Sequence, residues 1–269
     1  TMSCFYKVEA QDMANSGWDY TSASSYITLS FWFKASTAQT FYLLLFTSDG
    51  TAKSIVKAFT PGNTNWNKFT FKIPGASGVQ FDDDNGTGLD IGIVATYGTD
   101  KTGSGNNLDA WGNYNSSERV PDMASTWLTA GASEFEFTGL QLEVGDVATE
   151  FEYKTYHDEL LRCWRYYYLW LDGNAQATSD NASALFNTLY FTHHFPVKMR
   201  IAPALDMTSG TNWWTVYTSG TNGSVDTFGR DGITSYTVGA LSKAFTASAS
   251  PALLRSANSG CRIAWDAEL

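Results

Sequence analysis

The sequence is poor in charged residues, cysteine, proline and histidine. Charged side chains make up 16% of its 269 residues, against about 25% in a typical soluble domain. Its three cysteines, Cys4, Cys163 and Cys261, lie far apart and show no CxxC spacing. This pattern argues against a disulfide framework and against a zinc site. We therefore expect three buried free thiols, as in a protein that folds in a reducing cytosol.

The sequence also lacks a basic stripe and a long apolar run. Its net charge is −10. Nucleic-acid binding requires a basic surface, so we expect no nucleic-acid partner. No apolar run approaches the roughly 18 residues of a membrane span, and no signal peptide is present, so we expect no membrane insertion. Because Thr1 lies close to the first predicted strand, we expect that a preceding domain is missing.

Common catalytic motifs are absent as well. We find no GxSxG, HExxH or P-loop pattern, and each of these is a spacing that its chemistry requires. A pair of glycosidase carboxylates stays open, because their separation is a property of the fold and not of the sequence. We predict a binding or structural protein in preference to an enzyme.

Aromatic residues, by contrast, are abundant at 15%, and they favour β-strands. Short apolar or alternating runs recur between turns such as Asp49-Gly50 and Pro74-Gly75, which indicates an antiparallel sandwich or jelly roll. The predicted strands of the first half are Ser3–Ala10, Tyr26–Ala35, Thr40–Thr47, Ser54–Phe59, Lys68–Ile73, Leu89–Thr96 and Glu134–Val144.

The last of these strands changes phase in its middle. Phe135 and Phe137 share one parity, whereas Leu140 and Leu142 have the other. Since side chains alternate between the faces of a sheet, one extra residue would restore a common apolar face. The sequence therefore predicts a β-bulge at Thr138-Gly139.

The stretch from residue 153 to 170 predicts a connector between two domains. Thr155 is placed to cap a short helix, with Asp158 in its first turn. From Trp164 onward the period changes to two, which predicts that one face carries Trp164, Tyr166, Tyr168 and Trp170. We expect this aromatic face to pack between domains or subunits, with a sugar platform as the alternative.

Further strands are predicted at Leu185–Phe191, Trp213–Thr218, Thr234–Leu241 and Arg262–Asp266. Two prolines, Pro196 and Pro203, exclude a central strand between them. The predicted fold is thus all-β, with two antiparallel sandwich or jelly-roll domains at residues 1–152 and 171–269, joined by the short helix.

Aromatic residues in polar loops are the candidate carbohydrate-binding residues. Sugar rings stack on aromatic faces while neighbouring polar groups bind their hydroxyls. The alternative is that each ring plugs an end of a sandwich. The candidates are Trp18, Tyr20, Trp111, Tyr114, Trp213, Trp214 and Tyr217.

The acidic turn Asp82-Asp83-Asp84-Asn85-Gly86 has two interpretations. Oxygen ligands at this density can bind calcium, which makes the three aspartates a weak metal candidate. The turn lacks EF-hand spacing, however, and Asn85-Gly86 alone is typical of a hairpin. We favour the turn and expect no cofactor, with a structural calcium as the alternative.

Three segments resemble a known binding fold: SFWFKAS at residues 30–36, NTNWNKFTFKIPG at 63–75 and TGLQLEVG at 138–145. Together they resemble carbohydrate-binding modules with a galactose-binding-like jelly roll. Trp32 and Trp66 carry this resemblance and could equally be core residues. Those modules often place a calcium-binding Asp in the last strand, where this chain has Thr138, so the resemblance does not carry the family's metal site over.

A second resemblance covers most of the chain. QLEVGDVATEFEYKTYHDELLRCWRYYY at residues 141–168, FPVKMRIAP at 195–203 and the terminal DAEL resemble tail-fibre and receptor-binding proteins of tailed bacteriophages, especially marine ones. The resemblance implies a non-enzymatic virion protein, made in the bacterial cytoplasm, that forms a homotrimer with other virion proteins nearby and attaches to a host surface glycan. It also implies a native terminus at Leu269. A capsid decoration or head-fibre protein and a polysaccharide depolymerase are the alternatives.

Overall fold

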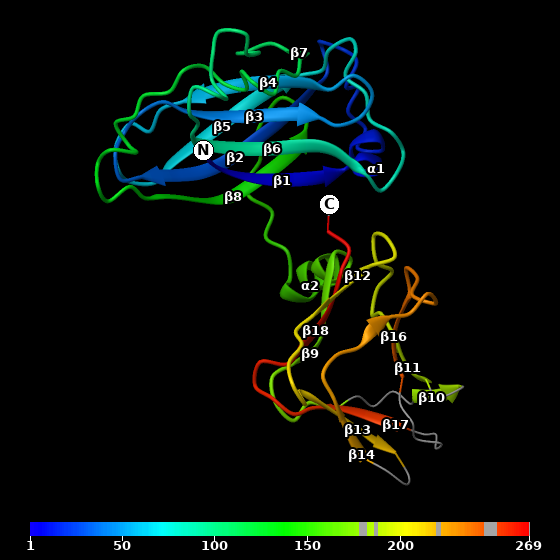
Figure 1. Cartoon of the computed structure of the whole chain (residues 1–269). Helices are drawn as coiled ribbons and strands as arrows, with labels where there is room; N and C mark the ends of the chain where they lie inside the picture. The colour runs from blue at the N-terminus through cyan, green and yellow to red at the C-terminus, as the bar shows by residue number, and fades with distance from the viewer. Residues whose placement is uncertain (178–181, 186–187, 219–221, 245–251, 269) are drawn as a thin grey trace. The chain divides into compact units, whose positions relative to one another are not determined.

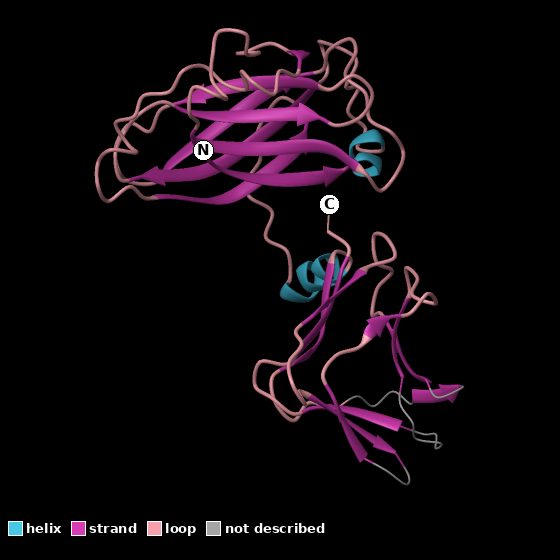
Figure 2. Ribbon diagram, in the orientation of Figure 1, coloured by secondary structure: helices cyan, strands magenta, loops and turns pink. Residues whose placement is uncertain are grey.

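Strand β2 (Tyr26–Ala35) shows why the first half of the chain folds as a sandwich. Leu29, Phe31 and Phe33 share one face and are fully buried, whereas Trp32 and Lys34 lie on the opposite face. The period of two therefore directs one face of the strand into a core. The computed structural model describes residues 1–177, 182–185, 188–218, 222–244 and 252–268, in which strands are the main regular secondary structure (Figure 2).

The described chain divides into two compact units, Thr1–Tyr153 and Lys154–Glu268. The first unit is a sandwich of a five-stranded and a three-stranded antiparallel sheet (Figure 1). The five-stranded sheet has the order β1 (Met2–Glu9), β6 (Thr87–Thr96), β3 (Phe41–Thr47), β4 (Lys53–Phe59) and β7 (Gly112–Asn113). The three-stranded sheet has the order β5 (Asn67–Pro74), β2 and β8 (Phe135–Val144). All seven strands predicted for this half are present.

A continuous aromatic core lies between the two sheets. The ring of Phe33 in β2 lies 5.0 Å from that of Phe41 and 5.1 Å from that of Phe59, and Phe31 lies 5.4 Å from Phe59. Phe41 in turn contacts Trp127, with ring centroids 6.1 Å apart. Aromatic pairs at this separation add to the stability that burial provides. The core fixes the three-stranded sheet, so the outward side chains of that sheet have defined positions.

The predicted β-bulge in β8 is confirmed. Ser30 pairs with Gln141 and Trp32 pairs with Thr138, so β8 uses three steps where β2 uses two. Gly139 has φ +61 there, a left-handed conformation that glycine adopts without a steric cost. The extra residue allows both Phe135 and Leu142 to pack against the core.

The long polar segment after β6 covers the outer face of the five-stranded sheet. A second, smaller core lies beneath it, with Leu44, Val56, Val94 and Val120 buried. Trp111 and Tyr114, predicted as binding residues in this segment, contact the sandwich. The Nε1 of Trp111 donates to the carbonyl of Pro74 at 2.7 Å, and Tyr114 stacks on Phe46 at 4.7 Å.

The second unit also consists of antiparallel sheets around a core of its own, which contains Leu171, Phe191, Trp214 and Trp265. One sheet has the order β14 (Asn222–Val225), β13 (Trp214–Thr218), β17 (Ala252–Ser256), β10 (Ala182–Leu185), β11 (Thr188–His194), β16 (Val238–Ala244) and β15 (Gly229–Arg230). The other has the order β12 (Ala204–Met207), β18 (Arg262–Asp266) and β9 (Tyr167–Asp172). Part of the strand predicted at Leu185–Phe191 lies outside the described residues, as does Leu269.

The segment predicted as a connector belongs to the second unit. Helix α2 (Tyr156–Trp164) is capped as expected, since Thr155 Oγ1 accepts the Asp158 N–H at 3.2 Å. The prediction that an alternating strand begins at Trp164 is wrong, because that residue ends the helix. The strand β9 begins at Tyr167 and pairs with β18. Neither helix in the described part of the chain is long and apolar enough to span a bilayer.

Two rings of β9 have partners within their own unit. His193 of β11 stacks on Tyr168 at 5.3 Å and on Trp170 at 4.8 Å, and both aromatic rings pack against the core of the second unit. Trp164 lies edge-on to Tyr168 at 5.8 Å, and Tyr166 is half-buried. Packing between subunits through this face stays a prediction.

The expected state of the cysteines is wrong at two of three positions. Cys261 is buried and donates to the carbonyl of Trp213, whereas Cys4 and Cys163 are exposed. Cys4 lies on β1, an edge strand of its sheet, and Cys163 lies on helix α2, which has no buried residues.

Candidate functional site

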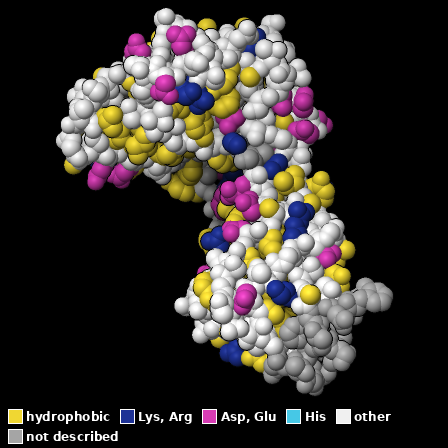
Figure 3. Space-filling view, viewed as in Figure 1, with side chains coloured by type: hydrophobic (Ala, Val, Ile, Leu, Met, Phe, Trp, Pro, Cys, Tyr) yellow, Lys and Arg dark blue, Asp and Glu magenta, His cyan; other side chains and the backbone are white. Residues whose placement is uncertain are grey.

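An open groove of about 820 Å³ lies at the edge of the first unit, where β1 and β8 are the outer strands of their sheets. It is lined by Met2 and Cys4 from β1, by Trp66 from the loop before β5, and by the continuous segment Ser133–Thr138. Figure 3 shows hydrophobic side chains exposed on the first unit, with acidic and basic groups among them.

Trp66 is the aromatic platform of this groove, with 42% of the residue exposed. Its loop is held by asparagine side chains. Asn67 donates to the carbonyl of Asn65 at 2.7 Å and of Asn63 at 3.3 Å, and accepts from the Gly62 N–H at 3.3 Å. Asn63 Oδ1 in turn accepts the Asn65 N–H at 2.8 Å. These bonds give the exposed ring a fixed position.

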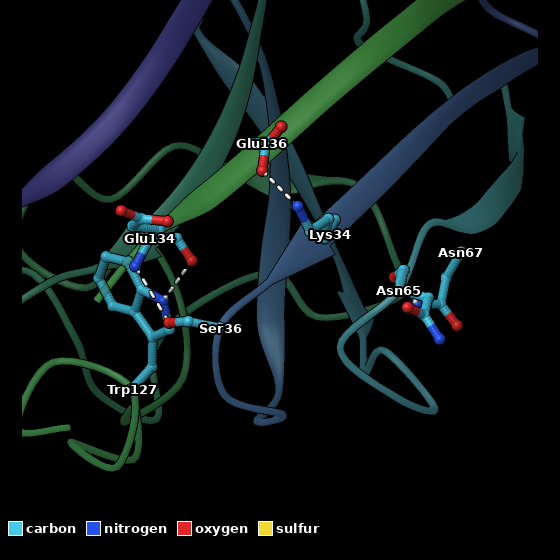
Figure 4. Close-up of polar contacts among 7 residues, drawn as sticks. All are labelled: Lys34, Ser36, Asn65, Asn67, Trp127, Glu134 and Glu136. Atoms are coloured by element: carbon cyan, nitrogen blue, oxygen red, sulfur yellow. Dashed lines mark hydrogen bonds and ion pairs between the residues drawn. The ribbon is translucent and has the colours of Figure 1, made fainter. Parts of the chain in front are cut away.

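An ion pair lies beside the ring. Lys34 Nζ is 2.6 Å from Glu136 Oε1 and 5.9 Å from the centroid of Trp66. Strand pairing places Lys34 directly opposite Glu136, with both side chains on the outer face of the sheet (Figure 4). The site thus presents an apolar ring, an ammonium donor and a carboxylate acceptor together.

Hydrogen bonds to the backbone of Glu134 hold the start of β8 in place. Ser36 N–H and Trp127 Nε1 both donate to the carbonyl of Glu134, at 2.9 and 3.0 Å, and the Glu134 N–H donates to Ser36 Oγ at 3.0 Å (Figure 4). Trp127 is itself buried in the core. The Glu134 side chain is left exposed at the groove. A buried tryptophan therefore positions an exposed carboxylate.

A second exposed tryptophan lies on the same outer face. Trp32, also 42% exposed, pairs with Lys68 of β5 and Thr138 of β8 and is two residues from Lys34 on β2. A Cβ built on Gly139 would lie 3.4 Å from the Trp32 ring and 3.8 Å from Phe151. The rings of Trp32 and Phe151 therefore both lie near Gly139, on the face where Lys34 lies beside Trp66.

The far end of this face is closed by a clamp. Gln141 and Glu143 point outward from β8 and bind the segment that follows it. Thr149 donates to the Glu143 carboxylate, and the Glu152 N–H donates to Gln141 Oε1 at 2.8 Å. Burial by itself raises the pKa of Glu143, but the hydrogen bonds from Thr149 and Gln141 outweigh it and lower that pKa below its ordinary value.

The structure corrects two of the predicted binding residues. Trp18 is 3% exposed and Trp214 is 0% exposed, and each packs in the core of its own unit. A ring with no free face cannot stack on a sugar, so a binding role for these two is wrong. The alternative given for these candidates was that the ring fills the end of a sandwich. Both rings are indeed packed inside their own units.

The remaining candidates are half-buried; Tyr20, Trp111 and Tyr114 do not line the groove, and Trp213 and Tyr217 belong to the second unit. Tyr20 lies against Phe81 at 5.0 Å, and Trp213 packs against the core of the second unit. Tyr217 accepts from Arg255 at 3.4 Å. Trp111 and Tyr114 lie against the sandwich as described above. A binding role for these five stays a prediction.

The acidic turn is used to anchor a helix. The carbonyls of Asp84 and Gly86 accept the N–H groups of Gln11 and Ala10, at 2.8 and 2.9 Å, where helix α1 (Ala10–Ala14) begins. Asp83 accepts from Asn15 at 2.8 Å. Within the described ranges no three His, Cys, Asp or Glu side chains form a group that could hold a metal ion. The turn is not the predicted hairpin, because β5 and β6 lie in different sheets.

The sequence did not predict the groove. It did contain a signal that the Trp32 ring, on the outer face of the sheet, is exposed. In residues 29–34 the rings of Phe31 and Phe33 alternate with Trp32, so a buried Phe face requires an outward Trp32. Trp66, in an asparagine-rich turn, was singled out only by the resemblance to carbohydrate-binding modules, which left open that Trp32 and Trp66 are core residues; both are 42% exposed. Comparison of the chain with protein-family models, with curated proteins and with solved structures gave no match.

Proposed function

We propose that the protein binds carbohydrate without catalysis, through the groove of its first unit. The observation that carries this is the exposed Trp66 ring held beside the Lys34–Glu136 ion pair. A pyranose ring has an apolar face that stacks on an aromatic ring, and hydroxyls that both donate and accept hydrogen bonds. An adjacent ammonium and carboxylate suit two neighbouring hydroxyls of one sugar, because one donates and the other accepts.

The setting that supports this proposal best is attachment of a tailed bacteriophage to its host. It rests on the resemblance of residues 141–168, 195–203 and the terminal segment to tail-fibre and receptor-binding proteins. In that setting the chain is a virion protein, and a homotrimer would present three weak glycan sites at once. Multivalent attachment of this kind gains affinity without new contacts.

Binding is tested with purified protein on a glycan array, followed by titration of the best ligand. We expect Trp66→Ala to weaken binding at least about tenfold, because a stacked ring contributes about 1.5 kcal/mol. Trp32→Ala tests whether the ligand extends along the outer face. Tyr236→Ala is the matched control, since Tyr236 is 43% exposed but belongs to the second unit.

The outcomes separate the alternatives. Unchanged affinity of Trp66→Ala would exclude this groove as the site. Release of reducing sugar from host envelope would show a depolymerase and contradict the non-enzymatic proposal. A map of the virion that places the chain on the capsid would favour a decoration protein over a tail fibre.

A further inference from the structure

The charges around Trp66 carry an inference about which sugars the groove accepts. The lining holds two carboxylates, Glu134 and Glu136, and no Lys or Arg; Lys34 lies beside it, and Lys68 lies opposite Trp32 outside the lining. Lys34 is neutralised by its ion pair with Glu136. The Glu134 carboxylate is exposed, and its residue is held in place through the backbone by Ser36 and Trp127. The groove therefore carries a net negative charge.

We infer that the groove selects glycans with free amino groups, binds neutral sugars less tightly and rejects uronic acids. This inference rests on the proposed function and names the ligand class of the same site. A protonated amine near Glu134 gains a charge-assisted hydrogen bond, whereas a uronate carboxylate meets a like charge. The net charge of −10 on the whole chain acts in the same direction.

The position of Glu134 makes this selection specific to one residue. Glu134, Glu136 and Thr138 alternate with Phe135 and Phe137 along the segment that lines the groove. Phe135 and Phe137 stack on each other at 6.4 Å, and Phe137 is 38% exposed. An amino sugar on Trp66 would thus meet the carboxylates on the outer face of the strand, while Phe135 and Phe137 point to the opposite, core-facing side.

The test uses three oligosaccharides of equal length: oligomers of glucosamine, of N-acetylglucosamine and of galacturonic acid. Each is titrated into the full chain at about pH 5.5, where carboxylates are ionised and amines are protonated. We expect affinity to fall in that order, by about fivefold per step, as for one solvent-exposed charge pair. Raising the salt to about 1 M should bring the three affinities together, because the Debye length falls to about 3 Å.

Glu134→Gln should lower the ratio of glucosamine to galacturonate affinity by about 25-fold, fivefold for each of the two steps, and leave N-acetylglucosamine binding unchanged. Asp100→Asn is the control, since this exposed residue follows β6 and is not among the groove residues. Galacturonate binding as tightly as glucosamine would overturn the inference and leave carbohydrate binding intact, and so would a Glu134→Gln ratio equal to that of the parent chain. If none of the three binds while another glycan on the array does, the inference fails and the proposed function stands; a blank array overturns both.

Discussion

Thr149 donates two hydrogen bonds to the carboxylate of Glu143, one from its backbone N–H at 3.1 Å and one from its hydroxyl. This contact lies outside the sandwich core, yet it ties the segment after β8 to the outer face of the sheet. Gln141 adds a bond to the carbonyl of Glu150 at 3.2 Å. The clamp connects the end of the first unit to the sheet that carries the groove.

Because these bonds lower the pKa of Glu143 below its ordinary value of 4.5, folding favours its ionised form. That stabilisation is present above the unfolded pKa and is lost as the pH falls through the lower folded pKa. We expect Glu143→Gln to lower the free energy of unfolding by about 1 kcal/mol at pH 7. The deficit should shrink in urea titrations as the pH falls through the lowered folded pKa. A deficit that is constant with pH would contradict the clamp.

The contribution of Asp90 to stability should depend on pH with the opposite sign to that of Glu143. Burial raises its pKa, and this outweighs the hydrogen bond from Ser48 and the charge of Lys7. The ionised form is therefore disfavoured by folding, and the cost appears as the pH rises through the folded pKa. We expect Asp90→Asn to stabilise the first unit at pH 7 and to have no effect at low pH. Equal stability of the variant and the parent chain at every pH would refute this.

Asn67 should affect binding more than stability. Asn67→Ala removes the bonds to Asn63, Asn65 and Gly62 that hold the Trp66 loop. We expect about fivefold weaker sugar binding and a loss of about 1 kcal/mol in unfolding free energy. Asn67→Asp keeps the acceptor for Gly62 but lacks the donors, so its affinity should lie near that of Ala. Affinity equal to the parent chain in both variants would show that the loop needs no support.

Gly139→Ala should destabilise the first unit by about 1 kcal/mol, since φ is +61 at the bulge. The added Cβ would lie in ordinary contact with Trp32, so the cost is conformational and not steric. Gly139→Asn should cost less, because asparagine tolerates the left-handed region better. Thermal unfolding of the three proteins gives the order. Alanine as stable as glycine would mean that the bulge is absent in solution.

Arg200 should be essential to the second unit. Its guanidinium is buried and donates to the carbonyls of Ala267 and Glu268, at 2.7 and 2.6 Å. Lysine keeps the charge but not the planar fork, so Arg200→Lys should cost at least about 2 kcal/mol. Arg230→Lys, at an exposed position, is the control. Hydrogen exchange at residues 262–268 reports the loss. Exchange as slow as in the parent chain would exclude the anchoring role.

Alternating or apolar runs were enough to predict seven of the eight strands of the first unit, all but the two-residue β7, and the change of phase was enough to predict the bulge at Gly139. The helix cap at Thr155 could also be predicted, because it depends only on residues close to it in the sequence. The short strands β12, β14 and β17 could not be predicted, since four or five residues carry no periodicity that separates them from loops. Their pairing comes from the core of the second unit.

The candidate site was harder to predict because it joins distant parts of the sequence. Met2, Trp66 and Phe137 meet only because β1 and β8 are edge strands of different sheets. Loop polarity pointed instead to Trp111, whose ring packs inward against the sandwich. An aromatic residue in a polar loop is exposed only where the fold leaves space around it, and sequence alone does not describe that space.

The residues of the clamp are separate from the residues that line the groove. Gln141, Glu143, Thr149 and Glu152 include the residues that make the segment distinctive, and they bind one another and not the groove. Substitutions around Trp66 can therefore change what the groove binds and leave the contacts among these four residues intact.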